Sequence, residues 1–212
     1  MAPGTGSSRE REFPTRPQQL PSPEANMQLR SVVPLLLLSS VAAAQQVTLR
    51  GKVEDVPGTG GFIVDCTQTR LTGAVAPFLG QHVLVRGDVV GTNPPTVQVA
   101  SIVATPEIFE IPGNPEVGNT MRFGATYTPG SRVDFYFALA PGFQPLGRSG
   151  TAFLGATARR VATGVIPQGG NLEIAVRMPN DAALIGRDVY AQAVLVSGRQ
   201  VVISNPDCKE IR

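Results

Sequence analysis

The sequence has no tryptophan, a single histidine and only two cysteines among its 212 residues. The chain therefore has few of the residues that histidine-based catalysis, cysteine-rich metal clusters and tryptophan-lined sugar sites require. Charged residues are also scarce, at 16% of the chain, and 18 basic against 16 acidic residues leave a formal net charge of +2. A polyanion-binding protein usually carries a larger or more clustered positive charge. Composition alone therefore does not identify a reaction or a ligand.

The residues that are present indicate a folded, turn-rich protein. Hydrophobic residues make up 42% of the chain, with 23 glycines and 19 prolines, a composition too apolar for a wholly disordered protein and unfavourable for long helices. The length fits one large or two small domains, and the pattern described below favours two.

The N-terminal part predicts export. Residues 1–26 combine prolines and mixed charges with few apolar residues, and we expect them to be disordered. Residues 27–44 contain Arg30, an apolar run over 31–41 and Ala42-Ala43-Ala44, the three parts of a signal peptide. The run is shorter than the roughly 20 residues that cross a bilayer, and a buried helix is the alternative. We expect cleavage near Ala44, leaving a mature chain without a transmembrane segment in the periplasm, the cell envelope or the extracellular space.

A signal peptide that begins at Met27 rather than at the first residue has two explanations. Either translation starts at Met27 and residues 1–26 are a mis-called start, or the leader is long. Export also changes the expectation for Cys66 and Cys208, because oxidising compartments permit disulfides. We predict a Cys66–Cys208 bridge; two free thiols are the alternative, and a metal site built from two cysteines and one histidine is less favoured.

Residues 45–105 are predicted to form a small OB-like β-barrel. Apolar residues alternate with polar ones from Val47 onward, with the period of two that is typical of strands. Gly51 and Gly87 fall within strands, where glycine permits the sharp bends of a small closed barrel. A generic small barrel or sandwich is the alternative. The expected strands are 47–54, 62–66, 69–72, 82–90 and 96–104, with a connector or helical turn over 74–80.

The segment 106–118, rich in proline and glycine, is predicted to link this barrel to a β-sandwich over 119–212. A one-turn helix is expected over 179–186, with Asn180 as its N-cap. A calcium site on Asp181 and Asp188 is disfavoured, because no dense run of acidic residues surrounds them. The phenylalanines are expected in the core. The expected strands are 121–127, 132–139, 150–154, 161–166, 171–178, 188–197 and 200–204.

Two stretches resemble a group of small exported proteins of planctomycetes and similar bacteria. MPNDAALIGRDVYAQ over 178–192, followed by VVISN over 201–205, is similar to their C-terminal β-sandwich module, although Ala183 stands where that pattern often has proline. VTLRGKVE, HVLVRGDVV and TVQVASIVA resemble the OB-like domain at the start of some of them. The resemblance implies export and an all-β fold, and it implies no activity, cofactor or site residue.

No catalytic set emerges from the sequence. His82 is the only histidine and is expected on the surface at the start of a strand, and no G-x-S-x-G, P-loop or G-x-G-x-x-G motif is present. Glu54, Asp55 and Asp65 fall at predicted strand ends, where carboxylates are usually solvated. We predict no catalytic residue, no cofactor and no metal ligand.

The leading hypothesis is an exported, non-catalytic β protein with a structural, adhesion, envelope or matrix role. The alternative is a module whose OB-like face binds an oligosaccharide or another polyanion through Arg50, Lys52 and Arg86. A hydrolase is a distant third. Nucleic acid is not an expected partner, because basic and acidic residues balance within 46–104 and few aromatic rings are available for stacking. The partner and the oligomeric state remain unknown.

Overall fold

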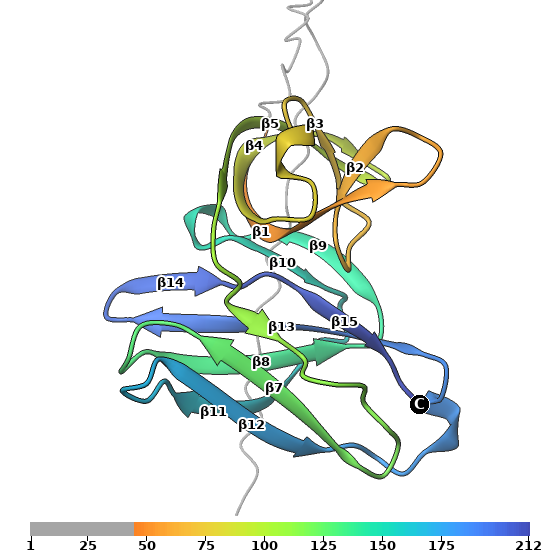
Figure 1. Ribbon diagram of the computed structural model, residues 1–212, viewed down its shortest axis with the longest axis vertical. Helices are drawn as coiled ribbons and strands as arrows, with labels where there is room; N and C mark the ends of the chain where they lie inside the picture. The colour runs from red at the N-terminus through yellow and green to blue at the C-terminus, as the bar shows by residue number, and fades with distance from the viewer. Residues whose placement is uncertain (1–44) are drawn as a thin grey trace, which may run out of the picture. The chain divides into compact units, whose positions relative to one another are not determined.

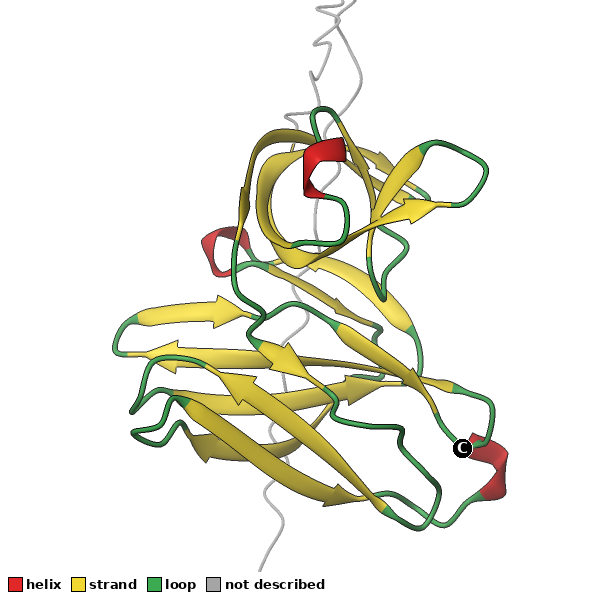
Figure 2. Cartoon of the chain, in the orientation of Figure 1, coloured by secondary structure: helices red, strands yellow, loops and turns green. Residues whose placement is uncertain are grey.

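The structure of this protein is a computed structural model that describes residues 45–212. The predictions of disorder over 1–26 and of a signal peptide over 27–44 lie outside these residues. The described chain is all-β, as predicted, with three short 3-10 turns between strands (Figures 1 and 2). None of the helical turns within 45–212 has the length and hydrophobicity needed to cross a membrane.

The first five strands close into the predicted barrel. Neighbouring strands follow the order β1-β2-β3-β5-β4, and β4 pairs back onto β1 (Figure 1). All pairs are antiparallel except β3 with β5. A single turn, η1 (Ala76–Phe78), occupies the expected connector between β3 and β4. The strands are β1 (Gln45–Val56), β2 (Gly61–Val64), β3 (Arg70–Thr72), β4 (His82–Thr92) and β5 (Pro95–Ala104).

The alternating pattern of β1 explains how the barrel packs. Val47, Leu49 and Val53 are at most 3% exposed, whereas Thr48, Arg50 and Lys52 alternate with them on the outer surface. Gly51 has the same inward orientation, and a Cβ there would lie 2.2 Å from Val64 Cγ1. A Cβ on Gly87 would lie 2.2 Å from the backbone oxygen of Gln98. These two glycines are therefore required by close approach of neighbouring strands.

Two further sheets form the sandwich. One has the order β11-β8-β13-β14, with β15 also paired to β13, and the other has the order β12-β7-β6. β9 and β10 form a separate hairpin. The strands are β6 (Phe109–Glu110), β7 (Thr120–Thr126), β8 (Arg132–Ala138), β9 (Pro141–Pro145), β10 (Thr151–Leu154), β11 (Arg159–Val165), β12 (Asn171–Arg177), β13 (Asp188–Ser197), β14 (Gln200–Ile203) and β15 (Asp207–Glu210).

Three phenylalanines lie at the centre of the sandwich. Phe109, Phe123 and Phe135 are at most 1% exposed, and their ring centroids lie 5.8–6.2 Å apart. Rings at this separation contribute about 0.5–1.5 kcal/mol per pair beyond the burial of their area. Leu172, Ile174 and Val176, which alternate along β12, pack on the same core. The assignment of these phenylalanines to the core is confirmed.

The segment 106–118, expected as a linker, contributes to the sandwich itself. It contains β6, and Ile108, Phe109 and Ile111 are buried in the sandwich core. The prolines and glycines of the segment hid this short strand from the sequence pattern. β9 and β15 were missed for a similar reason, since prolines begin and end β9 and Pro206 precedes β15.

Asn205 holds this segment in place. Its Oδ1 accepts hydrogen bonds from the backbone N–H groups of Ile108 and Phe109 at 3.0 and 3.1 Å, and its Nδ2 donates to the carbonyl of Phe109 at 2.7 Å. Asp207 adds a bond from the Ile111 N–H at 2.6 Å. The SN pair over 204–205, which carried part of the resemblance, therefore has a structural role.

The short helix of the sandwich begins one residue later than expected. The prediction of Asn180 as its N-cap is wrong, because Asp181 caps η3 (Ala182–Leu184) and its Oδ1 accepts from the Ala183 N–H at 2.9 Å. The bonded N–H belongs to the second residue of this 3-10 turn. Asp181 is therefore used in backbone capping, as a residue of its type commonly is.

The hairpin β9–β10 joins the barrel to the sandwich. Phe153 of β10 is 1% exposed and belongs to the barrel core, where it packs against Phe143 of β9. The Thr151 hydroxyl donates to the carbonyl of Thr48 in β1 at 2.7 Å. On the other side, the buried Gln192 amide of β13 accepts from the Phe153 N–H at 2.6 Å and donates to the carbonyl of Thr151 at 3.3 Å. Barrel and sandwich accordingly form one compact unit.

We expect Asn205→Ala to lower the free energy of unfolding by about 2–4 kcal/mol, because two buried N–H groups lose the acceptor that Asn205 Oδ1 provides. Asn119→Ala, which removes an exposed bond to Glu116, should change it by no more than about 0.5 kcal/mol. Urea unfolding of the two variants measures both effects. Equal stabilities for the two variants would contradict the role given to Asn205.

Candidate functional site

The three basic residues predicted as a binding face lie on the outer surface of the barrel. Strand register places Lys52 opposite His82, Arg50 opposite Leu84 and Arg86 opposite Thr48, so that all three belong to one face of the β1–β4 pair. The sandwich covers part of this face, because Thr151 bonds to the Thr48 carbonyl. The side chains of the three residues do not share one site.

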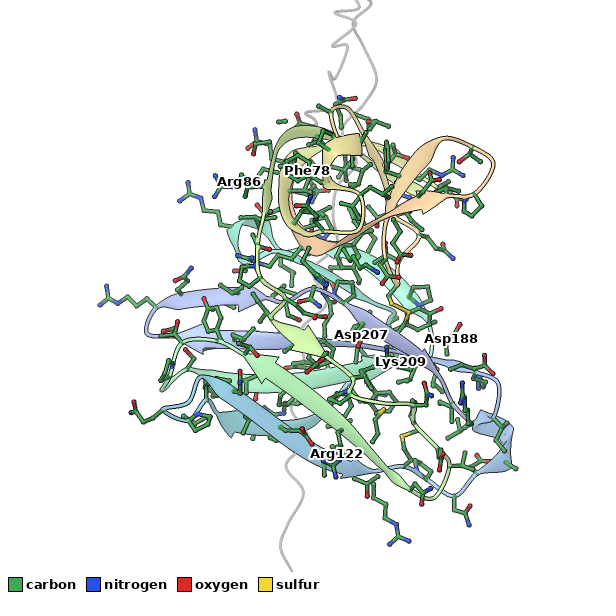
Figure 3. All side chains as sticks on the ribbon, viewed as in Figure 1. Phe78, Arg86, Arg122, Asp188, Asp207 and Lys209 are labelled. Carbon is green, nitrogen blue, oxygen red and sulfur yellow. A yellow bond between two sulfur atoms is a disulfide. The ribbon has the colours of Figure 1, made fainter. Side chains whose placement is uncertain are left out.

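Lys52 and Arg86 have separate surroundings. Lys52 Nζ lies 3.0 Å from Glu54 Oε1, and this bond and the Glu54 charge raise the pKa of Lys52. Arg86 is exposed and projects from the barrel (Figure 3). It lines a hollow of about 400 Å³ together with Gln46, Asp88, Ser101 and Arg148. Lys52 is thus neutralised by a neighbour, whereas Arg86 remains in solvent.

Arg50 lines a different hollow, of about 460 Å³, where the barrel meets loops of the sandwich. Thr105, Glu107 and Ile108 form one side, and Thr126, Tyr127, Gly170 and Asn171 form the other. Burial lowers the pKa of Arg50, and the nearby Tyr127 hydroxyl opposes that shift. Sequence reasoning singled out Arg50 but missed Tyr127 and Asn171, since no local pattern shows that residues this far along the chain return to β1.

His82 is half-buried, not on the open surface as expected. Its Nε2 lies 3.6 Å from Glu107 Oε1, and its side chain is 24% exposed. Burial raises the pKa of Glu107, while His82 opposes the increase. No hydroxyl or thiol nucleophile within residues 45–212 is hydrogen-bonded to His82. The side chains of His82 and Glu107 therefore meet at the start of β4.

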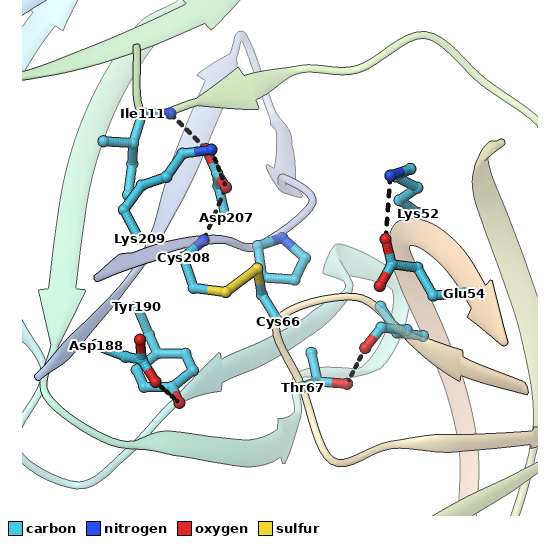
Figure 4. The surroundings of a disulfide bond; sticks show 12 residues. Lys52, Glu54, Cys66, Thr67, Ile111, Asp188, Tyr190, Asp207, Cys208 and Lys209 are labelled. Atoms are coloured by element: carbon cyan, nitrogen blue, oxygen red, sulfur yellow. Dashed lines mark hydrogen bonds and ion pairs between the residues drawn. A yellow bond between two sulfur atoms is a disulfide. The ribbon is translucent and has the colours of Figure 1, made fainter. Parts of the chain in front are cut away.

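The predicted disulfide between Cys66 and Cys208 is confirmed. The two Cα atoms lie 5.4 Å apart, and the bond connects the loop after β2 with β15 (Figure 4). The Asp65 carboxylate lies within 4.8 Å of both sulfur atoms. Because each sulfur is bonded to the other, neither is available as a thiolate ligand to a metal ion.

Backbone and side-chain contacts fix the two ends of this bond. Cys66 has a φ of +60°, which is uncommon for a residue with a side chain. The adjacent Thr67 stabilises the turn by donating its hydroxyl to the Val64 carbonyl at 2.7 Å and accepting from the Thr69 N–H at 3.0 Å. At the other end, the Cys208 N–H donates to Asp207 Oδ1 at 2.8 Å (Figure 4).

A third hollow is an apolar groove of about 630 Å³ beside the β9–β10 hairpin. Tyr136 of β8, Val194 of β13 and Ile203 of β14 line one side, and Phe143 and Leu154 of the hairpin line the other. It lacks a charged side chain, and the amide of Gln192 on its floor is already bonded to backbone groups. This groove offers apolar contact without a reactive group.

The most buried carboxylate of the sandwich is paired with arginines. Asp134 accepts from Arg132, and its Oδ1 lies 3.6 Å from Arg160 Nη1. Burial opposes the charge on Asp134, but the bonds from Arg132 and Thr163 and the charges of the two arginines outweigh it and lower the pKa of Asp134. The two arginine partners explain how Asp134 tolerates burial.

No protein-family model matches the chain, and no curated protein sequence matches it. Three solved structures show weak similarity. A chitin binding domain from Burkholderia pseudomallei matches at 10% identity and a TM-score of 0.30, over 47% of this chain and 57% of that one. An AA10 lytic polysaccharide monooxygenase from Streptomyces lividans matches at 12% identity and 0.27, over 47% and 58%. Red sea bream transglutaminase matches at 15% identity and 0.28, over 62% and 18%.

In each case this chain spans less than two thirds of the other protein's length. Similarities at these TM-scores carry no conclusion about what the protein binds or does.

We expect Asp65→Asn to stabilise the protein at pH 7 relative to the unchanged chain. Burial, followed by the charges of Glu54 and Asp207, raises the pKa of Asp65 in the folded state. A carboxyl whose folded pKa is raised destabilises the fold above that pKa, and this cost disappears as pH falls through the folded pKa to the ordinary value near 3.9. The stability difference should therefore shrink with acidification.

Urea unfolding of the two proteins at pH 7 and at pH 3.5, with the disulfide intact, measures this difference. Asp181→Asn at the exposed helix cap serves as the control for a neutralised aspartate. If Asp65→Asn is less stable than the unchanged chain at pH 7, or if the stability difference does not change with pH, the raised pKa of Asp65 is contradicted.

Proposed function

We propose that this protein is exported and acts outside the cytoplasm as a non-catalytic component of the cell envelope or an extracellular matrix, in a structural or adhesion role. The observation that carries the proposal is the Cys66–Cys208 disulfide. Disulfides persist in oxidising compartments and are rare where cytosolic thiols keep cysteines reduced. Both cysteines are only half-buried, so that a reducing environment would have access to the bond.

The position of the bond supports a mechanical role. It joins residues 142 positions apart and thereby ties the last strand of the chain to the barrel. In the chain-entropy description, closing a loop of this size stabilises the fold by roughly 4–5 kcal/mol. A protein that works outside the cell, without chaperones, gains from such a bond.

The use of polar groups in the interior supports a non-catalytic role. Gln192, Ser204 and Asn205 are each at most 3% exposed, and their hydrogen bonds go to backbone groups. Asp134 is neutralised by arginines, and His82 Nε2 lies 3.6 Å from Glu107 Oε1. The amides and the hydroxyl thus hold strands together, and of the charged groups named here Glu107 lines the hollow beside Arg50.

The experiment is cell fractionation of the native host followed by intact mass spectrometry with and without reductant. We expect the protein in the envelope or culture-fluid fraction, with a mass that begins near Gln45. Both cysteines should resist alkylation until reductant is added. Reduction of the disulfide should raise the mass by two hydrogens before the thiols are labelled.

Recovery from the cytosol with the N-terminal segment retained and two reactive thiols would refute the proposal of export. Turnover on a hydrolase panel that is lost when one acidic pair is mutated would refute the non-catalytic role.

A further inference from the structure

Arg50 differs from every other arginine of residues 45–212. It is half-buried, whereas the remaining arginines in this part of the chain are exposed. It also takes part in none of the ion pairs found within these residues, although Arg122, Arg132 and Arg160 have carboxylate partners. A guanidinium group that is partly withdrawn from water without a partner is unfavourable, unless an anion from outside the chain supplies one.

The surroundings of Arg50 form a hollow of ligand size. Its volume of about 460 Å³ falls within the roughly 300–1,000 Å³ of small-molecule sites, which are mostly apolar with a few placed polar groups. The Tyr127 ring and Ile108 supply apolar surface beside Arg50. A Cβ placed on Gly169 would meet nothing within 4 Å, so that one side of the hollow is open.

One polar group in the hollow is held in a fixed orientation. The Thr126 hydroxyl donates to Asn171 Oδ1 at 2.7 Å. This bond leaves the Nδ2 group of Asn171 as a donor for a ligand oxygen. The backbone also holds Tyr127 in position, since its N–H donates to the carbonyl of Gly170 at 2.9 Å. Arg50, Tyr127 and Asn171 thus combine a cation, a flat ring and an amide donor.

The charges favour a ligand with one planar carboxylate. A guanidinium group binds a carboxylate through two parallel hydrogen bonds. Glu107 lies in the wall of the same hollow and would repel a second carboxylate placed there, so that the hollow suits one carboxylate at a time. We propose that the hollow beside Arg50 binds a carboxylate-bearing sugar, the uronic acid unit of an acidic polysaccharide. The choice of a polysaccharide rests on the proposed envelope or matrix role.

Calorimetric titration of the full-length protein with tri-galacturonic acid tests this proposal. We expect binding, and we expect the fully methyl-esterified trisaccharide to bind at least tenfold more weakly, because esterification removes the charge that Arg50 recognises. This comparison changes the ligand alone and does not depend on any variant folding.

Variants then locate the site. Arg50→Ala should weaken binding by roughly 10- to 100-fold, the range expected for lost hydrogen bonds to a charged group. Arg50→Lys should restore only part of it, since an ammonium group cannot form the planar pair. Glu107→Gln should strengthen binding by about two- to fivefold through loss of repulsion. Arg86→Ala is the matched control, an arginine on the same barrel face but in another hollow, and should leave affinity unchanged.

No binding of tri-galacturonic acid at millimolar concentration would overturn the proposal. Equal affinity for the acid and its methyl ester would also overturn it. Equal losses of affinity in Arg50→Ala and Arg86→Ala would overturn it as well, because they would indicate binding to a diffuse basic surface. Recovery of the protein from the cytosol with free thiols would refute export, but it would not change the result of the titration. The proposal of export and the proposal of a binding site beside Arg50 can therefore fail independently.

Discussion

The Cys66–Cys208 bond is the constraint on which the arrangement of this protein depends. It joins the loop after the second barrel strand to the last strand of the sandwich, and no hydrophobic core of its own surrounds it. Without it, the segment 204–210 would be attached to the barrel through noncovalent contacts alone. That segment in turn holds residues 108–111 against the sandwich through Asn205 and Asp207. One covalent bond therefore stabilises the place where the chain passes from barrel to sandwich.

The β9–β10 hairpin provides the second connection, and it uses a different kind of interaction. Phe153 is buried in the barrel core, while the backbone beside it is bonded to Gln192 of the sandwich. A residue from the second half of the chain thus completes the core of the barrel, which the first half forms. The same arrangement brings Tyr127 and Asn171 to Arg50, because loops of the sandwich can line a hollow beside β1 only when the two parts are held together. The proposed binding site is a consequence of this connection.

The sequence was sufficient to predict features that depend on local pattern. Alternation in β1 predicted the inward set around Leu49. The glycines at 51 and 87 were expected to permit strand bends in a small barrel, and the structure shows in addition that neighbouring strands leave no room for a Cβ at either position. It was insufficient where distant residues decide the outcome. Nothing local indicates that Asn205 bonds to residue 109, that Phe153 belongs to the barrel, or that Arg50 faces Tyr127, since each depends on chain segments that meet only after folding.

Native-state hydrogen exchange, comparing the unchanged protein with Cys66→Ser/Cys208→Ser, tests most directly whether the disulfide makes barrel and sandwich one cooperative unit. In the unchanged protein we expect the slowest amides of β1 and β4 to open with the same free energy as those of β8 and β13. In the double variant, the barrel amides should open at a lower free energy than the sandwich amides. Barrel amides that keep the same opening free energy without the disulfide would contradict this view of the structure.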